Sequence, residues 1–219
     1  MRRFLIWYCI LSPIVFALVI AVLGFVTPGY DPAYRTIGEL SIGKYGWIEQ
    51  ANLLQLALCY VILSYILPIH FADLRTKKIW TIASWVCALV IVAVVLFPTL
   101  SLEELRVPLS SMPLAGIAHW LPMGLLFAVT PYLITIMAQS TAREKAFKHL
   151  AIPIAISGYV CCILMVVWLF LFYFNSGFGA FGLLQRVITL CCLFWPESCA
   201  LVMRQALRPD FKNPVSRTP

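Results

Sequence analysis

Apolar residues form six long stretches that are separated by short, more polar segments. The stretches cover about residues 4–26, 48–70, 79–97, 117–138, 150–174 and 182–203. Each stretch is close to the ~20 residues that a helix needs to cross the hydrocarbon core of a bilayer. Membrane-spanning strands are only about ten residues long and alternate in polarity, so a barrel does not fit. The pattern predicts an all-α polytopic membrane protein with a bundle of six transmembrane helices.

The connections between the stretches are too short to hold a separate soluble domain. We therefore predict a single transmembrane domain over residues 1–207 and a short basic tail over residues 208–219. The basic start of the chain, followed by an apolar run, resembles a secretory signal. That run is longer than a signal's apolar region and ends in Thr27-Pro28-Gly29 instead of a small-residue cleavage site. We expect it to remain as the first span.

Composition agrees with the hydrophobic pattern. Hydrophobic residues make up 62% of the chain, charged residues 11%, and the mean hydropathy is +0.93. A soluble domain has about 25% charged residues, so this composition excludes a soluble globular protein.

Basic residues are concentrated on one side of the predicted bundle, and this sets its expected orientation. That side carries Arg2, Arg3, Arg75, Lys77, Lys78, Arg143, Lys145, Lys148, Arg204, Arg208, Lys212 and Arg217. The other side carries Arg35, Lys44 and Arg106. Because cytoplasmic loops are enriched in Lys and Arg, both termini are expected in the cytoplasm. The net charge of +7 then reflects topology and contact with lipid headgroups, and we predict no nucleic-acid partner.

Cysteines and histidines give no sign of a cofactor. All eight cysteines fall within the predicted spans and none forms a CxxC motif, so we interpret them as small packing residues. His70 and His149 lie at the cytoplasmic ends of spans, whereas His119 lies at the opposite face. A dihaem bundle needs four axial ligands at matched depths, and no zinc motif is present. We predict no metal and no cofactor, with a His119–carboxylate metal site as the alternative.

The loop after the first stretch, over residues 27–41, is rich in Pro, Gly and Tyr, which indicates an ordered loop lying on the bundle. Thr36 and Glu39 have the spacing of a capping box, so a short interfacial helix is expected there. In that interpretation the Glu39 carboxylate accepts a hydrogen bond from a backbone N–H.

Polar residues within the spans are the candidates for function. Glu49, Asn52 and Gln55 follow one another at intervals of three, so they share one helix face, which should point into the bundle. Gln185 and Arg186 lie about one turn inside the last span. An arginine within a span normally has a partner, and we expect either Glu39 or Glu49 to pair with Arg186.

Several segments resemble a bacterial six-span membrane family catalogued as domain of unknown function 998. The resemblance rests on Pro28-Gly29-Tyr30-Asp31-Pro32, Thr36-Ile37-Gly38-Glu39-Leu40-Ser41, Gly46-Trp47, Phe97-Pro98, His119 and Gly182-Leu183-Leu184-Gln185-Arg186. It implies an integral protein of a bacterial inner (plasma) membrane. The family pattern usually has Ser where this chain has Gly38, and an acidic residue just after Phe97-Pro98, where this chain has Thr99-Leu100. If that acid serves chemistry in the family, its absence argues against catalysis here unless Glu103 substitutes for it.

Three functions remain open. In the favoured, non-enzymatic one, an extracytoplasmic polar pocket binds a lipid headgroup or small amphiphile, and membrane lipids are the expected partners, with a protein partner or a homo-oligomer also possible. The pocket residues are Glu39, Ser41, Glu49, His119, Gln185 and Arg186.

The first alternative is an intramembrane lipid hydrolase or transferase. Its catalytic candidates are Ser41 as nucleophile and His119 as base, with Glu39 orienting the histidine and Arg186 stabilising the oxyanion. The second alternative is a proton-coupled transporter in which Glu49 or Glu197 titrates.

Overall fold

The computed structural model describes residues 2–71, 73–97, 99–101, 113–143, 148–174 and 179–206, and every regular element in these ranges is helical. The long helices are α1 (Arg2–Val26), α2 (Gly46–Ile66), α3 (Leu74–Leu96), α5 (Leu114–Arg143), α6 (Lys148–Phe174) and α7 (Phe181–Ala206). Two short 3₁₀ helices, η1 (Gly38–Ser41) and η2 (Leu67–His70), flank α2. The all-α prediction is confirmed, whereas the predicted tail at 208–219 lies outside the described residues.

Five of these helices, α1, α2, α3, α5 and α6, are long and apolar enough to cross a membrane. α7 has 26 residues, which is also enough, but Arg186, Glu197 and Arg204 make it more polar. It packs along both α1 and α6. The chain is therefore a multi-pass helical protein of the membrane type.

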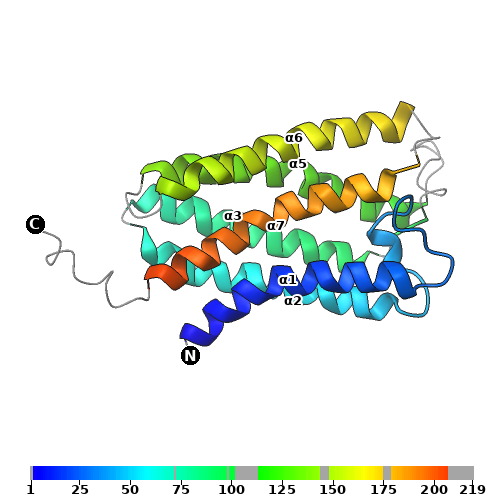
Figure 1. Ribbon diagram of the computed structural model, residues 1–219, viewed down its shortest axis with the longest axis horizontal. Coiled ribbons are helices and arrows are strands. Elements are labelled where there is room, and N and C mark those ends of the chain that lie inside the picture. The colour runs from blue at the N-terminus through cyan, green and yellow to red at the C-terminus, as the bar shows by residue number, and fades with distance from the viewer. Residues whose placement is uncertain are drawn as a thin grey trace, which may run out of the picture.

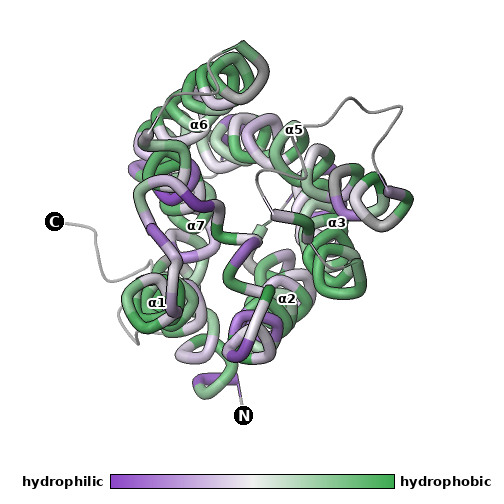
Figure 2. The backbone as a smooth tube through the Cα atoms, turned by 90° about the vertical axis from the view of Figure 1, so that its right-hand side faces the viewer, coloured by the Kyte–Doolittle hydropathy of each residue, from purple (hydrophilic) through white to green (hydrophobic). Residues whose placement is uncertain are grey.

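The long helices of the described chain form a closed ring in chain order. α1 contacts α2, and the contacts continue through α3, α5, α6 and α7 back to α1 (Figures 1 and 2). The connection between α1 and α2, residues 27–45, lies at one end of the ring together with the start of α7 (Figure 1). We call these residues the first loop and this end the loop end. The chain begins, and α7 ends, at the opposite end (Figure 1).

The ring is apolar on its outside and partly polar on its inside. Large exposed side chains on α1 include Phe4, Leu18 and Phe25, whereas Glu49 and His119 are buried. This arrangement reverses that of a soluble protein and is typical of a bundle whose outer surface is solvated by lipid chains. The eight cysteines are all free thiols, in agreement with their interpretation as packing residues.

Asp73 caps the first turn of α3. Its Oδ2 atom accepts hydrogen bonds from the backbone N–H and the hydroxyl of Thr76, both at 2.8 Å, and these hold the pKa of Asp73 below its ordinary value.

A depressed folded-state pKa gives stability that is present above the unfolded-state pKa and is lost as pH falls through the folded-state pKa. Between about pH 5 and pH 2, we expect the thermal midpoint to fall less in Asp73→Asn than in the wild type. Equal falls in the two proteins would contradict the cap.

Candidate functional site

The first loop is an ordered cap on the loop end of the ring, as its composition predicted. The backbone N–H of Ala33 donates to Asp31 Oδ1 at 2.9 Å, and the Tyr30 hydroxyl donates to the Thr36 carbonyl at 2.7 Å. These bonds satisfy polar groups of an irregular backbone that would otherwise be orphaned beside an apolar bundle. The loop therefore has a defined shape that can position side chains.

Glu39 holds η1 in place. Its Oε2 atom accepts hydrogen bonds from the backbone N–H of Thr36 at 2.7 Å and from the Thr36 hydroxyl at 3.2 Å. Its Oε1 atom accepts a hydrogen bond from Arg35 at 3.1 Å, which is also an ion pair. The carboxylate thus reaches back to the N–H of Thr36, as the glutamate of a capping box does. The expectation that Thr36 caps the short helix is wrong, because Ile37 is the N-cap of η1 and no side chain caps it.

The start of α7 is joined directly to the backbone of the first loop. The N–H groups of Gly182 and Leu183 donate to the carbonyls of Tyr34 and Ala33 at 3.1 and 3.0 Å. The first N–H groups of a helix have no partner within it, so the loop satisfies them. Gly182 permits this approach because a Cβ there would collide with the carbonyl oxygen of Arg35.

The guanidinium of Arg186 completes the junction between α7 and the first loop. Nη1 donates to the carbonyls of Pro32 at 2.7 Å, Gly182 at 3.0 Å and Arg35 at 3.2 Å. Nη2 donates to the Tyr30 hydroxyl at 2.6 Å, and the guanidinium lies 5.6 Å from the centre of that ring. A planar fork of donors suits several acceptors that face one another, which a single ammonium cannot match.

The ion pair predicted between Arg186 and Glu39 or Glu49 is wrong. Within the described residues, the partners of Arg186 are carbonyl and hydroxyl oxygens, and Glu39 pairs with Arg35 instead. Loop carbonyls satisfied the arginine because the folded first loop presents them together at the start of α7.

Burial raises the pKa of the Tyr30 phenol, although the hydrogen bond from Arg186 acts in the opposite direction, so Tyr30 stays protonated and can donate.

The polar face of α2 points into the bundle, as its spacing predicted, and meets α1. Asn52 Nδ2 donates to Glu49 Oε2 and to the Phe16 carbonyl, both at 3.2 Å. Gln55 Nε2 donates to Asn52 Oδ1 at 3.3 Å and to the Ser12 carbonyl at 3.2 Å. Glu49 is fully buried, and its Oε1 atom has no hydrogen-bond partner in the part of the chain that the structure describes.

His119 is oriented by the backbone at the end of α3. Its Nδ1 atom lies 2.7 Å from the Phe97 carbonyl, so in the neutral ring Nδ1 carries the proton and donates. The Nε2 lone pair then remains available, and it faces η1, since a Cβ built on Gly38 would lie 3.7 Å from Nε2 and 3.2 Å from Thr99 Oγ1. The Phe97 carbonyl thus occupies the orienting position that was predicted for Glu39.

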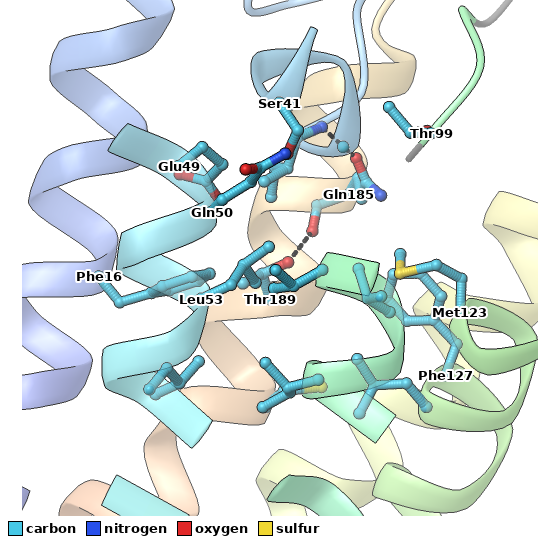
Figure 3. A pocket seen from close by; sticks show the side chains of 18 of the residues that line it. Phe16, Ser41, Glu49, Gln50, Leu53, Thr99, Met123, Phe127, Gln185 and Thr189 are labelled. Carbon is cyan, nitrogen blue, oxygen red and sulfur yellow. Dashed lines mark hydrogen bonds between the residues drawn. The ribbon is translucent and has the colours of Figure 1, made fainter. Parts of the chain in front are cut away.

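A cavity of about 100 Å³ lies inside the ring and is lined by α1, the first loop, α2, α3, α5 and α7. We call it the central cavity. Figure 3 shows Ser41, Glu49, Gln50, Gln185 and Thr99 toward one end of it. Its deeper wall is mostly apolar, with side chains such as Phe16, Leu53, Met123 and Phe127 (Figure 3).

The structure gathers four of the six predicted pocket residues at the central cavity, namely Ser41, Glu49, His119 and Gln185. Glu39 and Arg186 are not among its lining residues and instead hold the first loop.

The polar lining residues that sequence reasoning missed include Gln50, Thr99, Thr130 and Thr189. The last of these could have been found, because Thr189 lies one helical turn after Gln185 and its hydroxyl donates to the Gln185 carbonyl at 2.9 Å. Glu103, the suggested substitute acid, lies outside the described residues.

Gln185 connects the central cavity to the first loop. Its Oε1 atom accepts a hydrogen bond from the backbone N–H of Ile37 at 2.7 Å, and the side chain is buried. This bond leaves the Gln185 amide nitrogen without a partner among the described residues. Because Ile37 also lines the cavity, one side chain of α7 both fixes the loop and offers a donor to the cavity.

The described residues contain no group of three or more His, Cys, Asp and Glu side chains that could hold a metal ion. The absence of a cofactor stays a prediction.

Comparison with known proteins places the chain in a family but gives no nearer relative. No curated protein and no solved structure matches it. A family model does match, over residues 10–202, which include the first loop, both polar helix faces and every residue that lines the central cavity. The chain thus belongs to the family described as protein of unknown function (DUF998).

Proposed function

We propose that this membrane protein binds a lipid or another small amphiphile in the central cavity. The observation that carries the proposal is the division of that cavity into a polar end and an apolar wall. The headgroup would lie at the polar end beside Gln185 and His119, and the apolar chain would lie along Phe16, Leu53 and Phe127. Sites for small molecules commonly combine an apolar wall with a few polar groups that fix orientation.

The polar end offers unused hydrogen-bonding groups. Within the described residues, no hydrogen bond satisfies the Ser41 hydroxyl, the Gln50 amide, the Gln185 amide nitrogen or His119 Nε2. A hydrogen bond contributes about 0.5–1.5 kcal/mol net, so a polar ligand that pairs with several of these groups gains affinity. These groups include both donors and acceptors, which suits a headgroup with hydroxyl, amide or carboxyl functions.

The size of the central cavity limits what it can hold. Sites for drug-sized ligands usually occupy about 300–1,000 Å³. At about 100 Å³, the central cavity fits a small headgroup together with part of one chain rather than a whole phospholipid. We therefore favour a single-chain amphiphile.

The two alternatives have weaker support. A hydrolase needs its nucleophile within hydrogen-bond reach of its base, and no hydrogen bond joins Ser41 to His119 in the described part of the chain. A proton-coupled transporter could use the buried Glu49. The side chain that hydrogen-bonds to Glu49 in the described residues is the amide of Asn52, which does not titrate, so the contacts of Glu49 trace no route for a proton. The proposed setting is a bacterial inner membrane with both termini cytoplasmic.

Replacing His119 by alanine is expected to weaken binding of the amphiphile at least tenfold, because Nε2 is one of the free acceptors at the polar end. Native mass spectrometry of the protein purified in mild detergent measures the bound fraction. His149→Ala is the matched control, since His149 is exposed at the other end of the bundle.

A bound lipid that is lost in His119→Ala and retained in His149→Ala supports the proposal. A lipid that is retained equally in both variants would place its site elsewhere. A wild-type protein that binds no lipid or single-chain amphiphile would overturn the proposed function.

A further inference from the structure

A second cavity, of about 150 Å³, lies at the seam between α1 and α7. We call it the α1–α7 groove. Ala17, Ile20 and Ala21 line it from α1, and Arg186, Thr189 and Leu190 line it from α7. Ala21 is exposed, and Leu190 keeps 56% of its surface exposed, so the groove reaches the outer, lipid-facing surface of the ring. Alanine at two successive turns of α1 leaves the space open.

The α1–α7 groove and the central cavity are neighbours. Ile37, Thr189 and Leu193 line both of them, so one layer of side chains separates the outer surface from the interior. Side-chain rotations occur within nanoseconds when packing allows, whereas moving a helix takes microseconds or longer. A passage at this seam would therefore require the side chains of Ile37, Thr189 and Leu193 to shift.

Arg186 gives the α1–α7 groove a positive charge at its loop end. The guanidinium contacts neutral carbonyl and hydroxyl oxygens, which do not cancel its charge, and it forms no ion pair with a carboxylate in the described residues, although Glu49 interacts with it electrostatically. Lipid headgroups lie at the same level of a bilayer as the ends of spanning helices. An anionic headgroup would therefore be attracted to this end of the groove, while its chain lies against Ala17, Ile20 and Ala21.

We propose that the α1–α7 groove is the lateral entrance through which a single-chain amphiphile with an anionic headgroup passes from the surrounding bilayer into the central cavity. The inference rests on the proposed function. A lateral path keeps the chain in an apolar environment throughout, whereas a path through water would expose it. The loop end is the less suitable route, because Ile37, Gly38 and Ser41 of the first loop line the cavity there.

An entrance affects rates and not affinity, and this provides the test. Ala21→Phe fills the α1–α7 groove without adding a contact inside the central cavity. Binding of cis-parinaric acid, a fluorescent fatty acid, is followed in detergent by stopped-flow energy transfer from the protein's tryptophans. We expect the association and dissociation rate constants each to fall about tenfold, with Kd unchanged within about twofold. Leu18→Phe is the matched control, because Leu18 is exposed on α1 and does not line the groove.

Leu190→Ala is a second variant, which widens the groove and covers the case in which Ala21→Phe does not fold. In Leu190→Ala we expect the association and dissociation rate constants both to rise severalfold. We also expect the neutral alcohol with the same chain as cis-parinaric acid to associate with the wild type more slowly than the acid does. Unchanged rate constants in both Ala21→Phe and Leu190→Ala would overturn the lateral entrance. Faster dissociation with unchanged association, which weakens binding, would also overturn it, because an entrance changes both rate constants together. Wild-type protein that shows no saturable energy transfer would count against the proposed function itself, which separates the two failures.

Discussion

Replacing Gly182 by alanine is expected to lower the free energy of unfolding by about 3 kcal/mol. The added Cβ would collide with the Arg35 carbonyl oxygen and would lie 2.7 Å from the Pro32 carbonyl oxygen. Both atoms belong to a backbone that is tied to α7 by hydrogen bonds, so it cannot yield cheaply. Reversible denaturation in mixed micelles of dodecyl maltoside and SDS measures the change.

Gly179→Ala is the control for Gly182→Ala. A Cβ at Gly179 would meet no atom within 4 Å, so the change in stability should stay within about 0.5 kcal/mol. Helix propensity alone would make Gly182→Ala more stable by about 1 kcal/mol, because alanine favours a helix more than glycine does. The predicted loss of stability is therefore opposite in sign to the effect of helix propensity. Stabilisation in Gly182→Ala would show that the first loop is not docked on α7 as the structure has it.

Replacing Arg186 by glutamine is expected to cost about 2–4 kcal/mol of stability. The change removes the donors that satisfy the Pro32 and Arg35 carbonyls and breaks the hydrogen bond to the Tyr30 hydroxyl. Carbonyls left without donors at the rim of an apolar bundle carry a desolvation cost, and a shorter neutral amide cannot reach all of them. The same mixed-micelle denaturation measures the loss.

Two further variants separate the structural role of Arg186 from its charge. Arg186→Lys keeps the charge but presents a single ammonium, so only part of the stability should return. Arg204→Gln is the matched control, because Arg204 is exposed and its guanidinium lies 4.6 Å above the Trp7 ring, a contact worth at most about 1 kcal/mol. Wild-type stability in Arg186→Gln would contradict the contacts described.

Much of the fold could be predicted because the bilayer imposes its length on the sequence. Each apolar stretch corresponds to one long helix of the structure, since a chain in hydrocarbon satisfies its own backbone. The predicted spans were shorter than the helices where a polar turn extends the helix beyond its apolar stretch. This occurs at Leu74, where α3 begins after the Asp73 cap, and at Arg143, where α5 ends. Hydropathy cannot detect those turns, because their helical hydrogen bonds do not depend on apolar side chains.

The candidate site was predictable where its contacts are local. The spacing of Thr36 and Glu39 indicated the hydrogen bond between them, and the spacing of Glu49 and Asn52 indicated their shared face. In both cases the partners are three residues apart, so backbone geometry alone brings them together.

The partners of Arg186 were not predictable in this way. Its carbonyl acceptors at Pro32 and Arg35 are 154 and 151 residues distant along the chain. A carbonyl oxygen exists at every residue, so no residue type marks those that are bound. We expected a carboxylate partner because a buried positive charge is usually paired with a negative one. In the structure, backbone carbonyl oxygens of the first loop accept the hydrogen bonds of Arg186 instead.

The sequence by itself determined the helical class, the position of each long helix along the chain and the polar faces, because these depend on backbone hydrogen bonding in lipid and on periodicity. Only the tertiary structure decided that the helices close into a ring around a cavity, and that Arg186 and Glu39 hold the first loop whereas His119 and Gln185 line the cavity. The physical reason is that side-chain roles within a bundle depend on which atoms distant segments bring within hydrogen-bonding distance. That proximity is a property of packing and leaves no local pattern in the chain.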